Sequence, residues 1–167
     1  AACIAYEPLT GKEVWRIVRG TESTISMPFY GNKVLYFITG WIVREDGTKF
    51  HELLAVNPDG KGDITGTNII WKKETETLQL LTPVIRNGAI YWIDAKNVMK
   101  CHNALTGEEV WSQKLKDRYY SSPVYANGRI YFCSLKGETL IIKEGKSFEV
   151  VAQNKLESAI WATPAVL

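Results

Sequence analysis

Residues 82–93 read TPVIRNGAIYWI, and residues 122–133 read SPVYANGRIYFC. In both stretches a proline begins a short β-branched or aromatic segment, then comes Asn-Gly, and then an apolar segment rich in Ile and aromatic residues. Asn-Gly favours a two-residue type I′ turn because both residues tolerate positive φ, and the twist of this turn matches that of the strands it joins. Each stretch therefore predicts a β-hairpin. Residues 28–38, PFYGNKVLYFI, predict a third hairpin with Gly31-Asn32 at its turn.

These hairpins belong to a repeat that two kinds of residue mark independently. Pro83, Pro123 and Pro164 lie 40 and 41 residues apart, whereas Pro28 lies 55 residues before Pro83. Three tryptophans repeat nearly the same intervals, 56 residues and then 40: they are Trp15, Trp71 and Trp111. A fixed period of this length is typical of a repeat architecture. The longer first interval predicts an insertion at roughly residues 40–66.

The rest of each repeat predicts two more strands. VMKCHNA (residues 98–104) and ETLIIKE (residues 138–144) have the composition of third strands. LTGKEVW (residues 9–15) and LTGEEVW (residues 105–111) predict a glycine turn into a fourth strand, whose Trp is best buried against the neighbouring repeat. Trp71 stands one position further from its glycine, which predicts a β-bulge or a longer turn there.

The second strands are nearly continuous in apolar residues, so both faces of each sheet must be covered. No amphipathic helix is available in the sequence to cover them, and the remaining solution is to stack sheet upon sheet. The predicted fold is therefore all-β, a β-propeller of four-stranded antiparallel blades.

Aligned repeats give the expected boundaries along the single partial propeller. Residues 1–18 end one blade, residues 19–74 form a blade with the insertion, residues 75–115 and 116–156 form a blade each, and residues 157–167 begin another. We expect about three whole blades with partial blades at both ends, within a propeller of about six to eight blades. The exposed blade faces would then contact further blades or a second copy of the chain.

The repeat resembles that of the pyrroloquinoline-quinone-like, or tryptophan-docking, propeller family. The resemblance rests on the segments with Thr-Gly and Trp and on those with Ser-Pro-Val before the hairpin glycine, and it covers the whole chain. Glu7 and Asn103 depart from the Asp usual in the family repeat, and the last repeat lacks the Thr-Gly and the Trp. Relatives include quinoprotein dehydrogenases and the outer-membrane protein assembly lipoprotein, so the resemblance implies an extracytoplasmic location, periplasmic, outer-membrane-associated or secreted.

Residues for cofactor chemistry are not evident, so we expect no catalytic residue, no quinone and no calcium in this segment. The resemblance implies a vicinal cysteine pair for quinone-dependent enzymes, but Cys3, Cys101 and Cys133 are isolated and favour buried thiols. Residues 57–63, NPDGKGD, favour a surface turn because the bidentate Glu of an EF-hand-type loop is missing. Neither of the two histidines, His51 and His102, has a partner at metal-ligand spacing.

Binding residues are expected on the face formed by the connections between blades and by the turns between second and third strands. The predicted partner-binding residues are Trp41, Arg118, Tyr119, Tyr120 and Trp161, with Glu22, Asp94 and Lys136 on the same face. Aromatic residues with arginine on rigid loops suit protein or peptide recognition. The alternative is that Tyr119, Tyr120 and Trp161 pack between blades.

The charge pattern argues against nucleic acid as a partner, since a net charge of +2 is spread without a basic stripe. No apolar run is long enough to cross a membrane. We therefore expect a non-catalytic binding scaffold for a protein or peptide. Two alternatives stay open: part of a quinoprotein dehydrogenase whose cofactor residues lie elsewhere, and a carbohydrate- or polymer-binding propeller.

Overall fold

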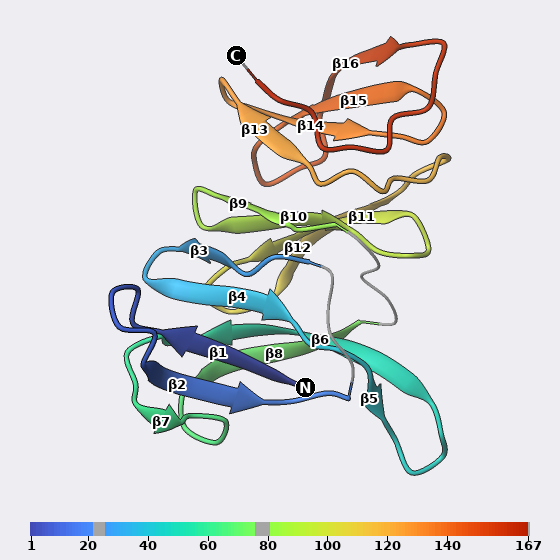
Figure 1. Ribbon diagram of the computed structural model, residues 1–167. Coiled ribbons are helices and arrows are strands. Elements are labelled where there is room, and N and C mark those ends of the chain that lie inside the picture. The colour runs from blue at the N-terminus through green and yellow to red at the C-terminus, as the bar shows by residue number, and fades with distance from the viewer. Residues whose placement is uncertain (22–25, 76–80, 167) are drawn as a thin grey trace. The chain divides into compact units, whose positions relative to one another are not determined.

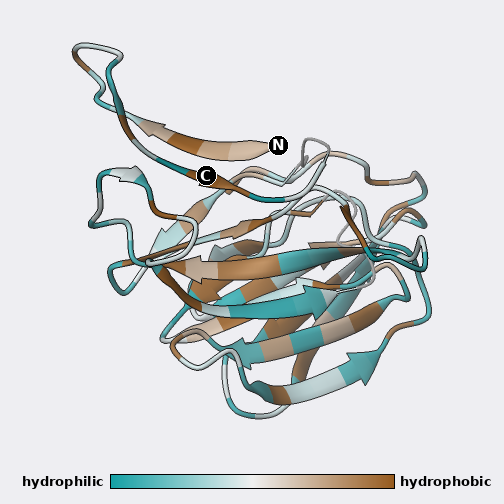
Figure 2. Cartoon of the chain, turned by 90° about the horizontal axis from the view of Figure 1, so that it is seen from below, coloured by the Kyte–Doolittle hydropathy of each residue, from teal (hydrophilic) through white to brown (hydrophobic). Residues whose placement is uncertain are grey.

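The computed structural model describes residues 1–21, 26–75 and 81–166, and these residues form strands and turns without a helix (Figure 1). The chain divides into two compact units, Ala1–Thr77 and Leu78–Leu167, and each unit is described separately. The fold class predicted from the sequence, all-β with four-stranded antiparallel propeller blades, is confirmed. Bands of hydrophobic and hydrophilic residues follow each other along the strands (Figure 2), as expected for sheets that bury side chains.

The first unit holds two sheets. One contains β1 (Ala2–Tyr6), β2 (Glu13–Val18) and β7 (Gly62–Asp63), in that order. The other contains β3 (Phe29–Gly31), β4 (Val34–Ile38), β5 (Ile42–Val43), β6 (Lys49–Val56) and β8 (Ile69–Thr75). Within it β6 pairs with β4 and β5 on one side and with β8 on the other.

The second unit consists of two four-stranded antiparallel sheets. The first contains β9 (Val84–Arg86), β10 (Ala89–Ile93), β11 (Val98–Asn103) and β12 (Glu109–Lys114). The second contains β13 (Val124–Ala126), β14 (Arg129–Cys133), β15 (Glu138–Lys143) and β16 (Val150–Lys155). Each sheet has its strands in sequence order, with a meander from the first strand to the fourth.

The hairpin turns are confirmed in the second unit and shifted by one residue in the first. Asn87 and Gly88 have φ of 45° and 75°, and Asn127 and Gly128 have 49° and 76°, as a type I′ turn requires. In the first unit the positive φ values belong to Asn32 and Lys33, while Gly31 pairs with Val34 at the end of β3. The predicted turn at Gly31-Asn32 was wrong by one position. The pairing of Gly31 with Val34 determines that Asn32 and Lys33 are the two turn residues.

The predicted insertion consists of two separate pieces. The first, residues 39–50, extends the hairpin between β4 and β6 and contains β5. The second, residues 57–68, joins β6 to β8 and carries β7 to the edge of β2, with which β7 pairs in parallel. A bulge between Ala55 and Val56 lies beside the residue that pairs with Trp71, but the same bulge recurs in the other sheets. It therefore does not account for the extra residue between Gly66 and Trp71.

Apolar residues of neighbouring sheets form the core of each unit. In the first unit Trp15 and Ile17 of β2 join Leu54 and Val56 of β6. In the second unit Tyr91 and Cys101 face a cluster that includes Phe132 and Leu140 of the next sheet. Trp111 lies at the margin of that cluster, where its indole Nε1 donates to the Gly145 carbonyl at 3.1 Å. The Trp111 ring also meets Phe148 edge-on, with centroids 5.5 Å apart.

Cys101 and Cys133 are buried free thiols, in agreement with the sequence prediction, whereas the free thiol Cys3 is only half-buried. Burial raises the pKa of the Cys101 thiol to about 11, so this thiol stays protonated at neutral pH. In the described residues no helix is long and apolar enough to cross a membrane.

Candidate functional site

Backbone hydrogen bonds join four connections of the second unit into one continuous surface. The Leu115 amide donates to the Asn97 carbonyl, and the Leu135 amide donates to the Arg118 carbonyl, both at 2.8 Å. The segment after β16 is held by the Leu156 amide, which donates to the Gly137 carbonyl at 2.9 Å. We call this surface, built from residues 94–97, 115–122, 134–137 and 156–163, the loop face.

A pocket of about 260 Å³ opens on the loop face, between the β10–β11 turn and the β12–β13 connection. Asp94 and Asn97 line it on one side, and Arg118 and Tyr120 line it on the other. Asp94 is engaged in its own turn, because its Oδ1 accepts the amides of Lys96 and Val98 at 2.9 Å. Its Oδ2 also lies 3.2 Å from the Lys100 ammonium. Asp94 therefore shapes the pocket, and the exposed Arg118 is the charged residue of the pocket that a ligand can reach.

Trp161 stands beside this pocket and is 64% exposed. Its ring contacts Tyr120, with centroids 5.6 Å apart and planes tilted by 57°. The Ile160 amide donates to the Ser134 carbonyl at 3.3 Å, which ties the chain beside Trp161 to the β14–β15 turn. A large exposed ring on a fixed backbone can bury apolar area in a partner at low entropic cost.

Tyr119 lies differently from its neighbour. Its ring is only 6% exposed and belongs to the core of the second unit. Burial raises the pKa of the Tyr119 phenol above its usual range. Tyr119 thus packs between sheets, which is the alternative that the sequence left open for it. It also lines the inner end of the pocket. Lys136 is 72% exposed and pairs with Asp117 at 2.7 Å.

The structure brings Arg118, Tyr120 and Trp161 together in the second unit, whereas Trp41 belongs to the first. Trp41 packs on His51, with ring centroids 4.0 Å apart, and its carbonyl accepts the Thr21 amide at 2.7 Å. His51 Nδ1 in turn lies 2.9 Å from the Thr39 carbonyl, so Trp41 and His51 brace the start of the β5 hairpin. Glu22 lies outside the described residues.

A second polar cluster, not predicted from the sequence, stands near Trp41. Glu52 is 1% exposed. Its carboxylate accepts hydrogen bonds from the Arg19 guanidinium and forms an ion pair with the Lys72 ammonium at 3.7 Å. Because a buried carboxylate is stable only when it is paired, this cluster fixes the first unit internally. In the described residues no group of His, Cys, Asp and Glu has the geometry to hold a metal ion.

The antiparallel sheets share one bulge, and three of them carry a Trp next to it, on β2, β8 and β12. This repeated sheet defines a protein of the β-propeller class. The family model described as outer membrane protein assembly factor BamB matches residues 3–149, and the chain belongs to this family.

Solved structures agree on the fold. The chain is similar to BamB from Moraxella catarrhalis, with a TM-score of 0.70 and 16% identity, over 99% of this chain and 47% of that one. It is also similar to the computationally designed Ika8 protein, with a TM-score of 0.67 and 9% identity, over 94% and 44% of the two chains. A europium-containing methanol dehydrogenase gives a TM-score of 0.55 and 12% identity, over 77% and 24%.

The chain therefore spans about half the length of the BamB structure that it resembles. Among curated proteins none matches the chain. At these identities the structural similarities establish the fold, and function has to be argued from the site.

Proposed function

We propose that this protein is a non-catalytic binding scaffold that holds a protein or peptide partner on the loop face of its second unit. The observation that carries the proposal is the exposed Trp161 ring packed on Tyr120 beside the pocket that Arg118 lines. Tryptophan, tyrosine and arginine are the residues that most often dominate binding energy at protein interfaces. The partner segment would place an apolar side chain on Trp161 and a carboxylate on Arg118.

The family supports an extracytoplasmic setting for this scaffold. A family described by outer membrane protein assembly suggests a partner from that process, and β-barrel proteins have strands in which apolar and polar residues alternate, with aromatic residues at the membrane borders. An extended segment with this pattern offers the apolar and polar groups that the loop face can bind. On this ground we propose a location in the periplasm or at the outer membrane.

The test is binding of a labelled synthetic peptide in which aromatic residues alternate with acidic and polar ones, followed by fluorescence anisotropy. Trp161→Ala should weaken binding about 30-fold, since a central tryptophan contributes at least about 2 kcal/mol. Arg118→Lys should weaken it less, because the charge stays while the bidentate fork is lost. Leu105→Ala is the matched control, because Leu105 is exposed on the turn before β12, away from the loop face. Equal affinity of the Trp161→Ala and Leu105→Ala variants would count against the proposal.

The alternative of a quinoprotein dehydrogenase has a structural similarity in its favour, that to the methanol dehydrogenase. Since that alternative expects the cofactor residues outside this segment, it is tested by titrating the complete protein with pyrroloquinoline quinone and calcium while recording the absorption spectrum and the melting temperature. A saturable change in both would favour the enzyme over the scaffold. The carbohydrate-binding alternative predicts instead that a neutral oligosaccharide quenches Trp161 fluorescence without dependence on salt.

A further inference from the structure

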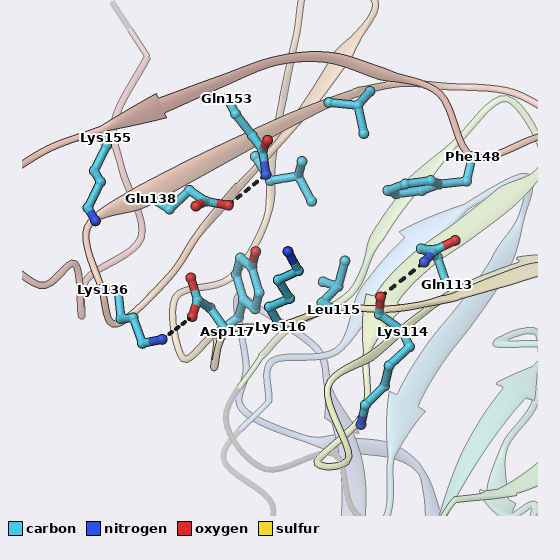
Figure 3. A pocket seen from close by; sticks show the side chains of 13 residues that line it. Gln113, Lys114, Leu115, Lys116, Asp117, Lys136, Glu138, Phe148, Gln153 and Lys155 are labelled. Carbon is cyan, nitrogen blue, oxygen red and sulfur yellow. Dashed lines mark hydrogen bonds and ion pairs between the residues drawn. The ribbon is translucent and has the colours of Figure 1, made fainter.

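A second recess in the second unit lies between the outer strands β12 and β16 (Figure 3) and shares Tyr119 with the pocket of the loop face. It has a volume of about 500 Å³, and we call it the β12–β16 groove. Its apolar lining comes from Leu115, Tyr119, Leu140 and Phe148. Both strands that border it are exposed and are the last strands of their sheets among the described residues.

The first unit contains the same arrangement with the groove already filled. There β2 corresponds to β12, since Trp15 pairs with Ala5 as Trp111 pairs with Cys101, and the bulge falls at the same place. The edge of β2 is covered by β7 in parallel, and the Ile64 amide donates to the Arg16 carbonyl at 3.0 Å. Ile64 is 3% exposed and enters the cluster of Trp15 and Ile17. An edge of this shape therefore accepts an extended segment with one aliphatic side chain.

The difference between the units lies in one connection. Residues 57–68 join the third strand to the fourth in the first unit and supply β7, whereas the shorter residues 144–149 join the corresponding strands β15 and β16. No covering strand on β12 comes from that short connection. By register Ser112 takes the place of Arg16, and its backbone groups point away from β11. Gln113 takes the place of the buried Ile17 and is exposed.

Charge on the groove favours an acidic occupant. Four lysines line it, namely Lys114, Lys116, Lys136 and Lys155, against the two carboxylates of Asp117 and Glu138. Both carboxylates already have partners, because Asp117 pairs with Lys136 at 2.7 Å and Glu138 accepts from the Gln153 amide at 2.8 Å (Figure 3). The net charge of the lining is therefore positive, with Lys114 and Lys116 on the β12 side and Lys155 on the β16 side.

We propose that the β12–β16 groove binds an extended acidic segment of a partner protein, which adds a parallel strand to β12 and inserts an aliphatic side chain against Leu140 and Phe148. This is strand addition, in which main-chain bonds supply affinity and one pocket supplies specificity. The groove shares Leu115, Lys116, Asp117, Tyr119 and Lys136 with the loop face. The proposal does not depend on Arg118, Tyr120 or Trp161, the residues that carry the proposed scaffold.

The test uses a fluorescein-labelled peptide with the sequence of residues 58–68, in which Lys61 is replaced by Asp. Full-length chain should bind this peptide, and raising the salt concentration should weaken the binding. Ser112→Pro should lower the affinity at least about tenfold, because proline removes the outward N–H while an edge position tolerates it. The double variant Lys116→Glu/Lys155→Glu should lower it by a similar factor and should bind a peptide with lysine in place of its acidic residues.

Two controls keep the test decisive. The peptide with Ile64→Asp should lose binding, and Trp161→Ala should leave the affinity for the unaltered peptide unchanged. Circular dichroism verifies that both variants are folded. Peptide binding that is unaffected by Ser112→Pro would overturn the proposal, as would failure of the unaltered peptide to bind. A dimer of the chain that Ser112→Pro dissociates would also overturn it, because the groove would then hold a second copy.

Discussion

Gly137 lies in surroundings that leave no room for a side chain. Its φ is +80°, and a Cβ at this position would lie 2.4 Å from the carbonyl oxygens of both Leu156 and Ser158. Gly128 has nearly the same φ, +76°, but nothing within 4 Å of a Cβ. Gly128→Ala should therefore cost about 1–2 kcal/mol of left-handed strain. Gly137→Ala should cost several times more, measured as free energy of unfolding in urea. Similar losses for the two variants would mean that the segment after β16 is not held against this turn.

Because of Tyr91, the stability of the second unit should decrease at alkaline pH. It is 1% exposed, its oxygen accepts the Gly145 amide at 2.9 Å, and burial raises the pKa of its phenol to about 12. Between pH 10 and 12 the unfolded chain has lost this proton and the folded chain keeps it, so the free energy of unfolding falls as the pH rises. Replacing Tyr91 with Phe should reduce that fall by up to about 1.4 kcal/mol per pH unit. An unchanged pH profile would show that Tyr91 is not buried.

At the residue scale, turn chemistry could be predicted from the sequence and side-chain exposure could not. Asn87-Gly88 and Asn127-Gly128 adopt the predicted turns because the dipeptide itself carries the preference for positive φ. Tyr119 and Tyr120 are adjacent in a connection without periodicity, and only the three-dimensional course of the chain decides which ring enters the core.

At the scale of the elements, β7 is the feature that links neighbouring sheets in the first unit. Ile64, the residue after β7, is buried against Trp15 and Ile17, so Ile64→Ala should lower the free energy of unfolding by about 2–4 kcal/mol. Ile70→Ala, on the exposed face of β8, removes the same atoms from a residue that is 50% exposed and should cost less than about 1 kcal/mol. Thermal or urea unfolding followed by circular dichroism compares the two. Equal losses would indicate that β7 does not cover the edge of β2.

The sequence predicted that an insertion exists, but not what it builds. The first proline and tryptophan intervals exceed the later ones, which locates the extra residues. A strand of two residues such as β7 has too little pattern of its own to be recognised, and its partner β2 lies more than forty residues earlier. The β12–β16 groove was missed for the same reason, because its lysines come from separate segments that only the folded sheets bring together.

At the scale of the whole molecule, both units use one plan, in which a sheet buries the Trp-bearing edge of its predecessor. The fold follows from the repeat, and the family model that matches residues 3–149 confirms it. Function rests on far fewer residues, since the exposed Trp161 and Arg118 are the part of the predicted site that the structure leaves available. The expected absence of a quinone or a metal stays a prediction.

The claim that this protein binds a partner through the loop face is tested most directly by NMR of the six tryptophan indole N–H groups. The peptide of alternating aromatic and acidic residues is titrated into the labelled chain, followed in a separate sample by pyrroloquinoline quinone with calcium. The account predicts that the peptide shifts the signal of Trp161 and leaves that of the buried Trp92 in place, and that the quinone with calcium shifts neither. A Trp161 signal that the peptide does not move, while the quinone with calcium moves other indole signals saturably, would contradict it.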